Sequence, residues 1–254
     1  MKPLDLAEVA EFVNENITDF HQRRLQAIST LSLNKLLKKN PYLLRAKNTT
    51  TAIEFIDGFL DAFLSSSEEK LFGDFLEELA LFVAGKTTGG HKSAAPGVDL
   101  EFMDAGIHYI VSIKSGPNWG NSSQQKKLAE DLQNAAKRVR QSRRTIAVRP
   151  VLGICYGKTR TSELHGYLKV VGQNFWYLIS GNKELYIDIV EPIGYRAKEQ
   201  NDAFLAQKVR IRNRLHKEFM NRFYDDDGQI DWPALLRHTS GNYDLDNFIT
   251  QPST

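Results

Sequence analysis

Apolar residues recur three and four positions apart through most of the first 84 residues. The segments with this spacing are LAEVAEFVNENI, LNKLLKKNPYLL, AIEFIDGFLDAFL and KLFGDFLEELALFV. Such spacing places the apolar side chains on one face of an α-helix, so it predicts a helical N-terminal region over residues 1–84. We expect the last of these helices to begin at Ser65 to Ser67, because serine accepts hydrogen bonds from free helix amides, and to end at Gly85.

The period changes after the glycine-rich segment KTTGGHKSAAPG, which we expect to be a loop. In VDLEFM and IHYIVSIK, apolar residues occupy every second position, which predicts two strands. Asp104, Ala105 and Gly106 between the two segments have the chemistry of a turn. The simplest pairing is therefore an antiparallel hairpin.

Further helices and strands are predicted downstream. Ser122 is expected to cap a helix that runs to about Gln141, with Gln125 as its capping-box partner. RPVLGICYG predicts a buried strand, YLKVVGQNFWYLIS a buried helix, ELYIDIVEPI a strand, and NDAFLAQKVRIRNRLHKEFMNRFY a long basic helix. The order indicates an α/β fold, with a second region over residues 85–254 that contains this basic helix.

Composition excludes several classes of protein. The single cysteine, Cys155, excludes a zinc site built from several cysteines, and we expect it to pack in the core. No apolar run approaches the roughly 18 residues that a membrane span needs, and the N-terminus lacks the pattern of a signal peptide, so we expect a cytoplasmic protein. The glycine-rich phosphate-binding motifs of nucleotide hydrolases are absent. Apart from His91, the histidines show no metal-binding spacing and are expected to be structural: His21, His108, His165, His216 and His238.

Charge is distributed unevenly along the chain. The net charge of +2, from 33 basic and 31 acidic residues, does not by itself indicate a nucleic-acid partner. Residues 126–144, however, contain seven basic residues and only two acids, Glu130 and Asp131. The basic residues are Lys126, Lys127, Lys137, Arg138, Arg140, Arg143 and Arg144. A similar excess recurs from Lys208 to Arg222. Each stretch suits either a DNA-binding surface or a solvated helix face.

The predicted hairpin carries the candidate chemistry. Asp99 and Glu101 project from one face of the first strand, and Ser112 and Lys114 from one face of the second, so the turn can bring these faces into register. Carboxylates and a lysine at strand ends suit metal-assisted hydrolysis of a phosphodiester. Oxygen ligands hold Mg²⁺, which activates water, while the lysine orients that water or stabilises developing charge. Taken singly, each residue also suits a plain surface role.

The segments PGVDLEF and YIVSIKSGPNWGNSSQQ resemble the PD-(D/E)XK nucleases, and within them the type II restriction endonucleases. The resemblance implies a restriction-endonuclease-like core with a central mixed β-sheet flanked by helices. In the family pattern a metal-binding aspartate is followed, one strand later, by an acidic residue two positions before a lysine. Asp99 and Lys114 match, but Ser112 stands where the acid is expected. Either Glu101 supplies the missing carboxylate, or one comes from elsewhere.

Many relatives also place a glutamate on the helix before the core, and this chain offers Glu77 and Glu78. At about 100° per residue, Glu78 falls at the margin of the apolar arc formed by residues 71–83, and Glu77 falls nearly opposite. We therefore expect Glu78 to point inward and to join Asp99 and Glu101 as a metal ligand.

The loop and helix start after Lys114 are the expected DNA contacts. A helix N-terminus beside the lysine favours phosphate, and polar side chains there can reach DNA. The candidates are Asn118, Trp119, Asn121, Ser122, Ser123, Gln124, Lys126 and Lys127. A rigid turn packed by Trp119 explains the same residues without DNA. His91 and Lys92 suit either a backbone contact or a loose polar loop.

The resemblance implies a type II restriction endonuclease that cleaves double-stranded DNA with Mg²⁺. A homodimer, each subunit cutting one strand of a palindromic site, is expected, with residues 1–84 as candidate interface and residues 85–254 as nuclease core. A cognate DNA methyltransferase is the expected partner in the same system. Two alternatives stay open: a repair or junction-resolving nuclease that recognises DNA shape, and a DNA-binding module without catalysis, which Ser112 would explain.

Overall fold

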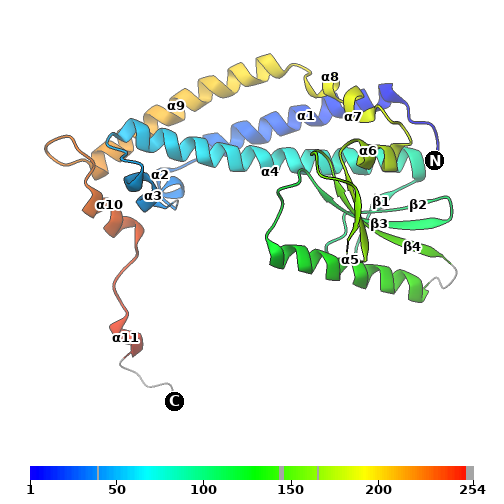
Figure 1. The fold of residues 1–254 in the computed structure, drawn as a ribbon. Coiled ribbons are helices and arrows are strands. Elements are labelled where there is room, and N and C mark those ends of the chain that lie inside the picture. Colours follow the sequence, from blue (N-terminus) through cyan, green and yellow to red (C-terminus); the bar gives the residue numbers. More distant parts are fainter. Residues whose placement is uncertain (39, 143–145, 165, 250–254) are drawn as a thin grey trace. The chain divides into compact units, whose positions relative to one another are not determined.

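The structure, a computed structural model, describes residues 1–249 except residues 39, 143–145 and 165 (Figure 1). Arg143, Arg144 and His165 therefore lie outside the described residues. The chain forms two compact units: unit 1 comprises Met1–Gln22 and Glu69–Ala197, and unit 2 comprises Arg23–Glu68 and Lys198–Thr254. Helices α1 (Leu6–Ser29) and α4 (Ala52–Thr88) each contribute to both units. The units thus differ from the division at residues 84 and 85 that we expected.

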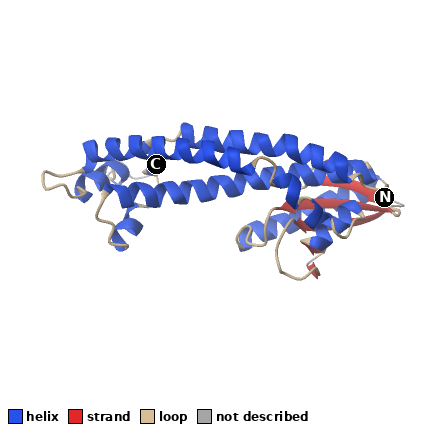
Figure 2. Cartoon of the chain, turned by 90° about the horizontal axis from the view of Figure 1, so that it is seen from above, coloured by secondary structure: helices blue, strands red, loops and turns tan. Residues whose placement is uncertain are grey.

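Unit 1 contains a six-stranded mixed sheet, with its strands coloured red in Figure 2, in the order β1-β2-β3-β4-β6-β5. Strands β3, β4 and β6 run parallel, while β1 with β2, β2 with β3, and β5 with β6 are antiparallel. The strands are β1 (His91–Lys92), β2 (Leu100–Asp104), β3 (Ile107–Lys114), β4 (Ala147–Ile154), β5 (Ser162–Leu164) and β6 (Tyr167–Val171). The remaining helices of unit 1 are α5 (Ser122–Ser142), α6 (Gln173–Ser180), α7 (Leu185–Asp188) and α8 (Val190–Ile193).

The predicted hairpin is confirmed as β2 and β3. Its two central turn residues, Ala105 and Gly106, have φ angles of 46° and 78°, the left-handed conformation that matches the twist of a two-residue hairpin. This turn sets a register in which Leu100 lies opposite Val111. Continued by one residue, the register places Asp99 opposite Ser112.

Each face of the sheet has its own core. Leu100, Phe102, Val111 and Ile113 pack with side chains from α1, α4 and α6. On the other face, Ile110 and residues of β4 pack against α5, which runs along the sheet in Figure 1. Because side chains alternate between faces, Asp99, Ser112 and Lys114 project toward the α5 side.

Helix α4 differs from its prediction at both ends. The serines expected to cap it lie in its interior, where the Ser66 hydroxyl donates to the Ala62 carbonyl (3.0 Å). A serine satisfied in this way does not interrupt a helix. The helix also continues past Gly85 to Thr88 and ends before Gly89, whose φ of 71° is the left-handed conformation common after a helix.

Three predictions for other segments are wrong. The expected loop over residues 86–97 contains the end of α4 and β1. YLKVV forms β6, not a helix, because a short apolar run carries no period and its pairing with β4 decides its structure. ELYIDIVEPI forms α7 and α8, not a strand. Its buried residues, Leu185 and Ile189, are four positions apart, which is helical spacing.

Unit 2 is helical in its described residues and has a separate core. It contains parts of α1 and α4 together with α2 (Leu33–Leu36), α3 (Pro41–Ala46), α9 (Ala197–Phe223), α10 (Trp232–Thr239) and α11 (Asp246–Ile249). Phe55 and Phe59 of α4 and Phe219 of α9 lie in this core. Helix α9 confirms the predicted long basic helix. Within the described residues, no helix has both the length and the apolarity needed to cross a membrane.

Candidate active site

Asp99 is held rigidly at the start of β2. Its backbone N–H donates to the Val111 carbonyl (2.9 Å), which continues the hairpin ladder. Its Oδ2 atom accepts hydrogen bonds from the Ile113 amide (2.6 Å) and the Ser112 hydroxyl (3.2 Å). All the hydrogen bonds and ion pairs of this carboxylate within the described residues use Oδ2. The Oδ1 atom is therefore available to a ligand.

Lys114 lies beside Asp99 at the end of β3. Its Nζ atom is 3.8 Å from Asp99 Oδ2, donates to the Ile113 carbonyl (2.8 Å) and lies 5.9 Å from the centre of the Trp119 ring. An ammonium group at that distance from an indole is attracted to the ring. The hairpin thus brings the predicted acid and amine together, and Trp119 helps to position the amine.

Both side chains open onto one pocket of about 380 Å³. Strand ends form one wall, and the loop after Lys114 and the first turns of α5 form the other. The lining residues are Gly97, Asp99, Ser112, Lys114, Trp119, Gly120, Gln124, Lys127, Leu128 and Asp131. A concave site with a carboxylate and an amine at its base is suited to a phosphate group and a cation.

Glu101 does not line this pocket. Its two carboxylate oxygens accept from the Ser93 hydroxyl (2.5 Å) and contact His108 Nε2 (2.9 Å). Both oxygens of Glu101 therefore have protein partners, whereas Asp99 has partners only at Oδ2 within the described residues. The structure favours the alternative in which the missing carboxylate comes from elsewhere.

The prediction that Glu78 points inward is wrong. Glu78 is exposed, whereas Glu77 is partly buried and pairs with Lys92 (3.3 Å). The helical arc was misplaced because Ala80 and Ala84 are fully buried, while the larger Leu71, Phe72 and Phe82 remain partly exposed. Those alanines rotate the buried face toward Glu77. Neither glutamate lines the pocket at Asp99.

Cys155 follows β4 and packs in the core, as predicted. Burial raises the pKa of its thiol, the Glu77 carboxylate raises it further, and the Lys114 ammonium lowers it. Burial has the largest effect, so the thiol stays protonated at neutral pH and is not a nucleophile.

The start of α5 is capped by different residues from those predicted. Asn121, not Ser122, is the N-cap: its Oδ1 accepts from the Gln124 amide (3.1 Å), and Gln124 Oε1 accepts from the Asn121 amide (2.8 Å). This reciprocal pair fixes the first turn. The candidate DNA contacts around it are exposed, except Trp119, which is partly buried: Asn118, Asn121, Ser122, Ser123, Gln124, Lys126 and Lys127.

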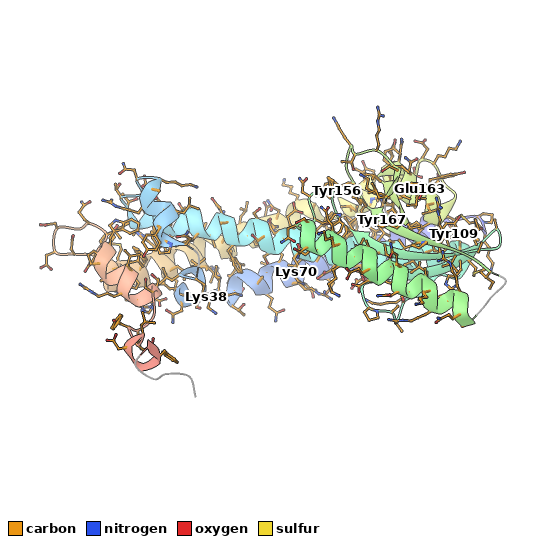
Figure 3. All side chains as sticks on the ribbon, turned by 60° about the horizontal axis from the view of Figure 1, so that its bottom comes forward. Lys38, Lys70, Tyr109, Tyr156, Glu163 and Tyr167 are labelled. Atoms are coloured by element: carbon orange, nitrogen blue, oxygen red, sulfur yellow. The ribbon has the colours of Figure 1, made fainter. Side chains whose placement is uncertain are left out.

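A second pocket, of about 510 Å³, adjoins the first at Trp119. It is formed by the loop Ser115–Trp119, by Glu69 and Lys70 of α4, and by Tyr156; Figure 3 labels Lys70 and Tyr156. A Cβ at Gly116 would lie 2.6 Å from the Tyr156 ring, so only glycine permits this packing. The loop after the lysine is thus held against the loop after β4.

Asp131 is an acidic residue of the pocket that was not predicted from the sequence. It was counted only as an acid among basic residues, yet it lines the pocket with Asp99. A signal was available: Asp131 lies three positions after Leu128 and four before Ala135, both buried against the sheet. That spacing places Asp131 on the inward face of α5, whereas Glu130 is exposed.

A mixed sheet covered by helices on both faces, with an acid and an amine at the ends of adjacent strands, defines a restriction-endonuclease-like nuclease. The sequence model of the family described as type II restriction endonuclease EcoO109I matches residues 7–201. This match covers more than half of the chain, so the chain belongs to that family and is a site-specific deoxyribonuclease. No curated protein is significantly similar to the chain.

Proposed function

We propose that this restriction endonuclease cleaves double-stranded DNA with Mg²⁺ bound at Asp99 and with Lys114 acting on the attacking water. The observation that carries the proposal is the placement of Lys114 Nζ 3.8 Å from Asp99 Oδ2 in one pocket. A lysine there orients the water and stabilises the charge that develops on the phosphate. Hydrogen bonds from the Ser112 hydroxyl and the Ile113 amide fix the position of the Asp99 carboxylate.

The residues present fit a magnesium ion. Carboxylate oxygens are its preferred protein ligands, and Asp99 Oδ1 has no protein partner within the described residues. No group of three or more His, Cys, Asp or Glu side chains in the described part of the chain is arranged to hold a metal ion by itself. Mg²⁺ suits such a site because it keeps several waters and takes oxygens from the substrate phosphate. When bound, it would polarise the phosphate and lower the pKa of water.

We assign DNA contact to the loop after Lys114 and the first turns of α5. Trp119, Gln124 and Lys127 from this segment line the pocket, most of its other polar residues are exposed, and the free amides of a helix start attract phosphate. The assigned residues are Asn118, Trp119, Asn121, Ser122, Ser123, Gln124, Lys126 and Lys127. Asn121 and Gln124 contribute mainly by capping the helix.

The proposal includes a homodimer that acts on palindromic sites, because two-fold protein symmetry matches such a site. Unit 2 exposes apolar side chains one helical turn apart, Leu205 and Val209 of α9, which suits an interface. A DNA methyltransferase that protects the same sequence is the proposed partner, and the cytoplasm is the proposed location. Sedimentation analysis of wild type and of Leu205→Glu/Val209→Glu tests the dimer, which the double variant should dissociate.

The central test is digestion of a plasmid of known sequence, with Mg²⁺, with Mn²⁺ and without metal. Discrete fragments whose ends map to one sequence are expected only with metal. Asp99→Asn and Lys114→Ala should each reduce cleavage by about 10³-fold or more, because each removes a group that contacts the reacting atoms. Both variants should still shift DNA in a gel.

Glu163→Gln is the matched control, since Glu163 is an exposed carboxylate on β5 that pairs with Arg149, away from the pocket. It should cleave like wild type. Unchanged cleavage by Asp99→Asn and Lys114→Ala would contradict the assigned centre. Branched DNA cut far faster than linear duplex would favour a junction nuclease, and specific binding without cleavage in either metal would favour an inactive module.

A further inference from the structure

The proposed site has only one carboxylate along the hairpin. Ser112 occupies the position of the expected acid, is 1% exposed and donates its hydroxyl to Asp99. A serine hydroxyl engaged in this way is a poor ligand for Mg²⁺. The pocket is therefore one acidic ligand short unless another element supplies it.

Asp131 supplies a carboxylate from the opposite wall. It lines the same pocket as Asp99, with its side chain only 19% exposed. A Cβ at Gly97 would lie 2.7 Å from Asp131 Oδ2, and Gly97 has a φ of 72°. The absence of a side chain at Gly97 thus lets the carboxylate approach the chain two residues before Asp99.

The charge of Asp131 is only weakly compensated by the protein. Its one ion pair within the described residues joins Oδ1 to Lys127 (3.3 Å), whose side chain is 74% exposed. Such an exposed pair contributes little to stability. A partly buried carboxylate whose only such partner is an exposed lysine is well placed to bind a cation in the pocket.

The other acids near the hairpin are engaged or point away. Glu101 is held by Ser93 and His108, and Glu77 is paired with Lys92. Glu130, adjacent to Asp131 in the sequence, is exposed. Among the described residues, only Asp99 and Asp131 contribute carboxylates to this pocket.

We infer that Asp131 takes the place of the acid missing at Ser112 and is the second protein ligand of the metal. The inference rests on the proposed function of this pocket. It places the cation between the sheet and α5, held by Asp99 from one side and Asp131 from the other. Metal binding should then link α5 to the β2–β3 hairpin and raise the unfolding temperature of the free protein.

The test measures metal binding directly, without DNA. Terbium(III) binds oxygen ligands and emits light when a nearby tryptophan is excited, and Trp119 lines this pocket. Terbium titration, followed by displacement with Mg²⁺, compares wild type with Asp131→Asn, Asp99→Asn, Glu101→Gln and Glu130→Gln. Asp131→Asn and Asp99→Asn should each weaken binding by about 10-fold to 100-fold or more, since each removes a charged ligand. Glu101→Gln and Glu130→Gln should bind like wild type.

Two further measurements separate a ligand from a structural carboxylate. Lys127→Met removes the ion pair but keeps the Asp131 carboxylate, so it should not weaken terbium binding. Without metal, Asp131→Asn should unfold at nearly the same temperature as wild type, because the lost ion pair is exposed on the lysine side. With Mg²⁺, plasmid cleavage by Asp131→Asn should fall by about 10²-fold.

Each outcome has a defined meaning. If Asp131→Asn binds terbium like wild type while Asp99→Asn does not, the role of Asp131 is overturned and the proposed function stands. If Glu101→Gln weakens binding and Asp131→Asn does not, Glu101 is the ligand and the inference fails. If neither aspartate variant weakens binding, the metal lies outside this pocket, and the proposed centre fails with it.

Discussion

The two long basic helices, α5 in unit 1 and α9 in unit 2, use their charges differently. On α9, Arg212 makes two hydrogen bonds to Asp57 (2.5 and 2.7 Å), and Lys208 pairs with Asp61 (2.8 Å). On α5, Lys126, Lys137 and Arg138 have no acidic partner within the described residues. Both stretches had the same two interpretations from sequence, a DNA-binding surface or a solvated helix face.

This difference shows that the number of charges on a helix does not identify its partner. Lys208 and Arg212 of α9 neutralise acids on α4 and hold that helix in the core of unit 2. On α5, Lys126, Lys137 and Arg138 are available to phosphate, and Lys126 adjoins Lys127, which lines the pocket of Asp99 and Lys114. This contrast supports the proposed DNA contact at α5 and assigns a structural role to Lys208 and Arg212 of α9.

The largest expected effect is on DNA affinity, which should fall when basic residues of α5 are replaced but not when those of α9 are replaced. Lys126→Ala/Lys127→Ala should weaken binding by about 10-fold or more and reduce the slope of log affinity against log salt by about 2, because about one counterion is released per phosphate contact. Lys208→Ala/Arg212→Ala should leave the slope unchanged. Fluorescence anisotropy with a duplex over a range of salt concentrations measures both. Equal losses in the two double variants would remove the distinction.

A smaller effect should show how the first turn of α5 is held. Asn121→Ala removes the side chain that accepts from the Gln124 amide, and should lower the free energy of unfolding by about 1 kcal/mol. Ser122→Ala, the matched control at the position that sequence favoured, should cost much less. Urea denaturation of both variants gives the comparison. A larger loss at Ser122 would restore the predicted cap.

The smallest effect concerns the anchoring of α9 and depends on pH. Hydrogen bonds from Arg212 lower the pKa of Asp57 below its ordinary value of 3.8. Just below pH 3.8 the unfolded chain therefore binds more protons at Asp57 than the folded chain does. The stabilisation by Asp57 is complete above that pH and is lost as the pH falls through the lower pKa of the folded state. Asp57 and Arg212 side chains are 37% and 39% exposed, and solvent screening limits the gain to about 1 kcal/mol or less.

Thermal unfolding of wild type and Asp57→Asn between neutral and strongly acidic pH tests this effect. The difference between their unfolding temperatures should be constant near neutrality and should shrink below pH 3.8. Asp202→Asn, which changes an exposed acid on α9, is the control and should match wild type throughout. A difference that persists at the lowest pH would show that Asp57 acts through packing instead of charge.

Sequence patterns predicted elements whose period is clear and whose contacts are local. The hairpin of β2 and β3, the helix α5 and the helix α9 each have a strong period or a turn signal, and all three were found. Short apolar segments were predicted less well. YLKVV was predicted as part of a helix and is a strand, and ELYIDIVEPI was predicted as a strand and forms two short helices. Such segments adopt the structure that their neighbours in space allow.

The sequence by itself determined that Asp99 and Lys114 meet, because strand periodicity and a two-residue turn are local properties that set which side chains share a face. It also determined the family, through residues 7–201. Only the tertiary structure decided which other carboxylate lines the pocket with Asp99 and Lys114. Glu78 turned outward, Glu101 was bound by its neighbours and Asp131 entered the pocket, since each depends on how separate elements pack. The same reason governs α9, whose charges found their partners on α4, more than a hundred residues away.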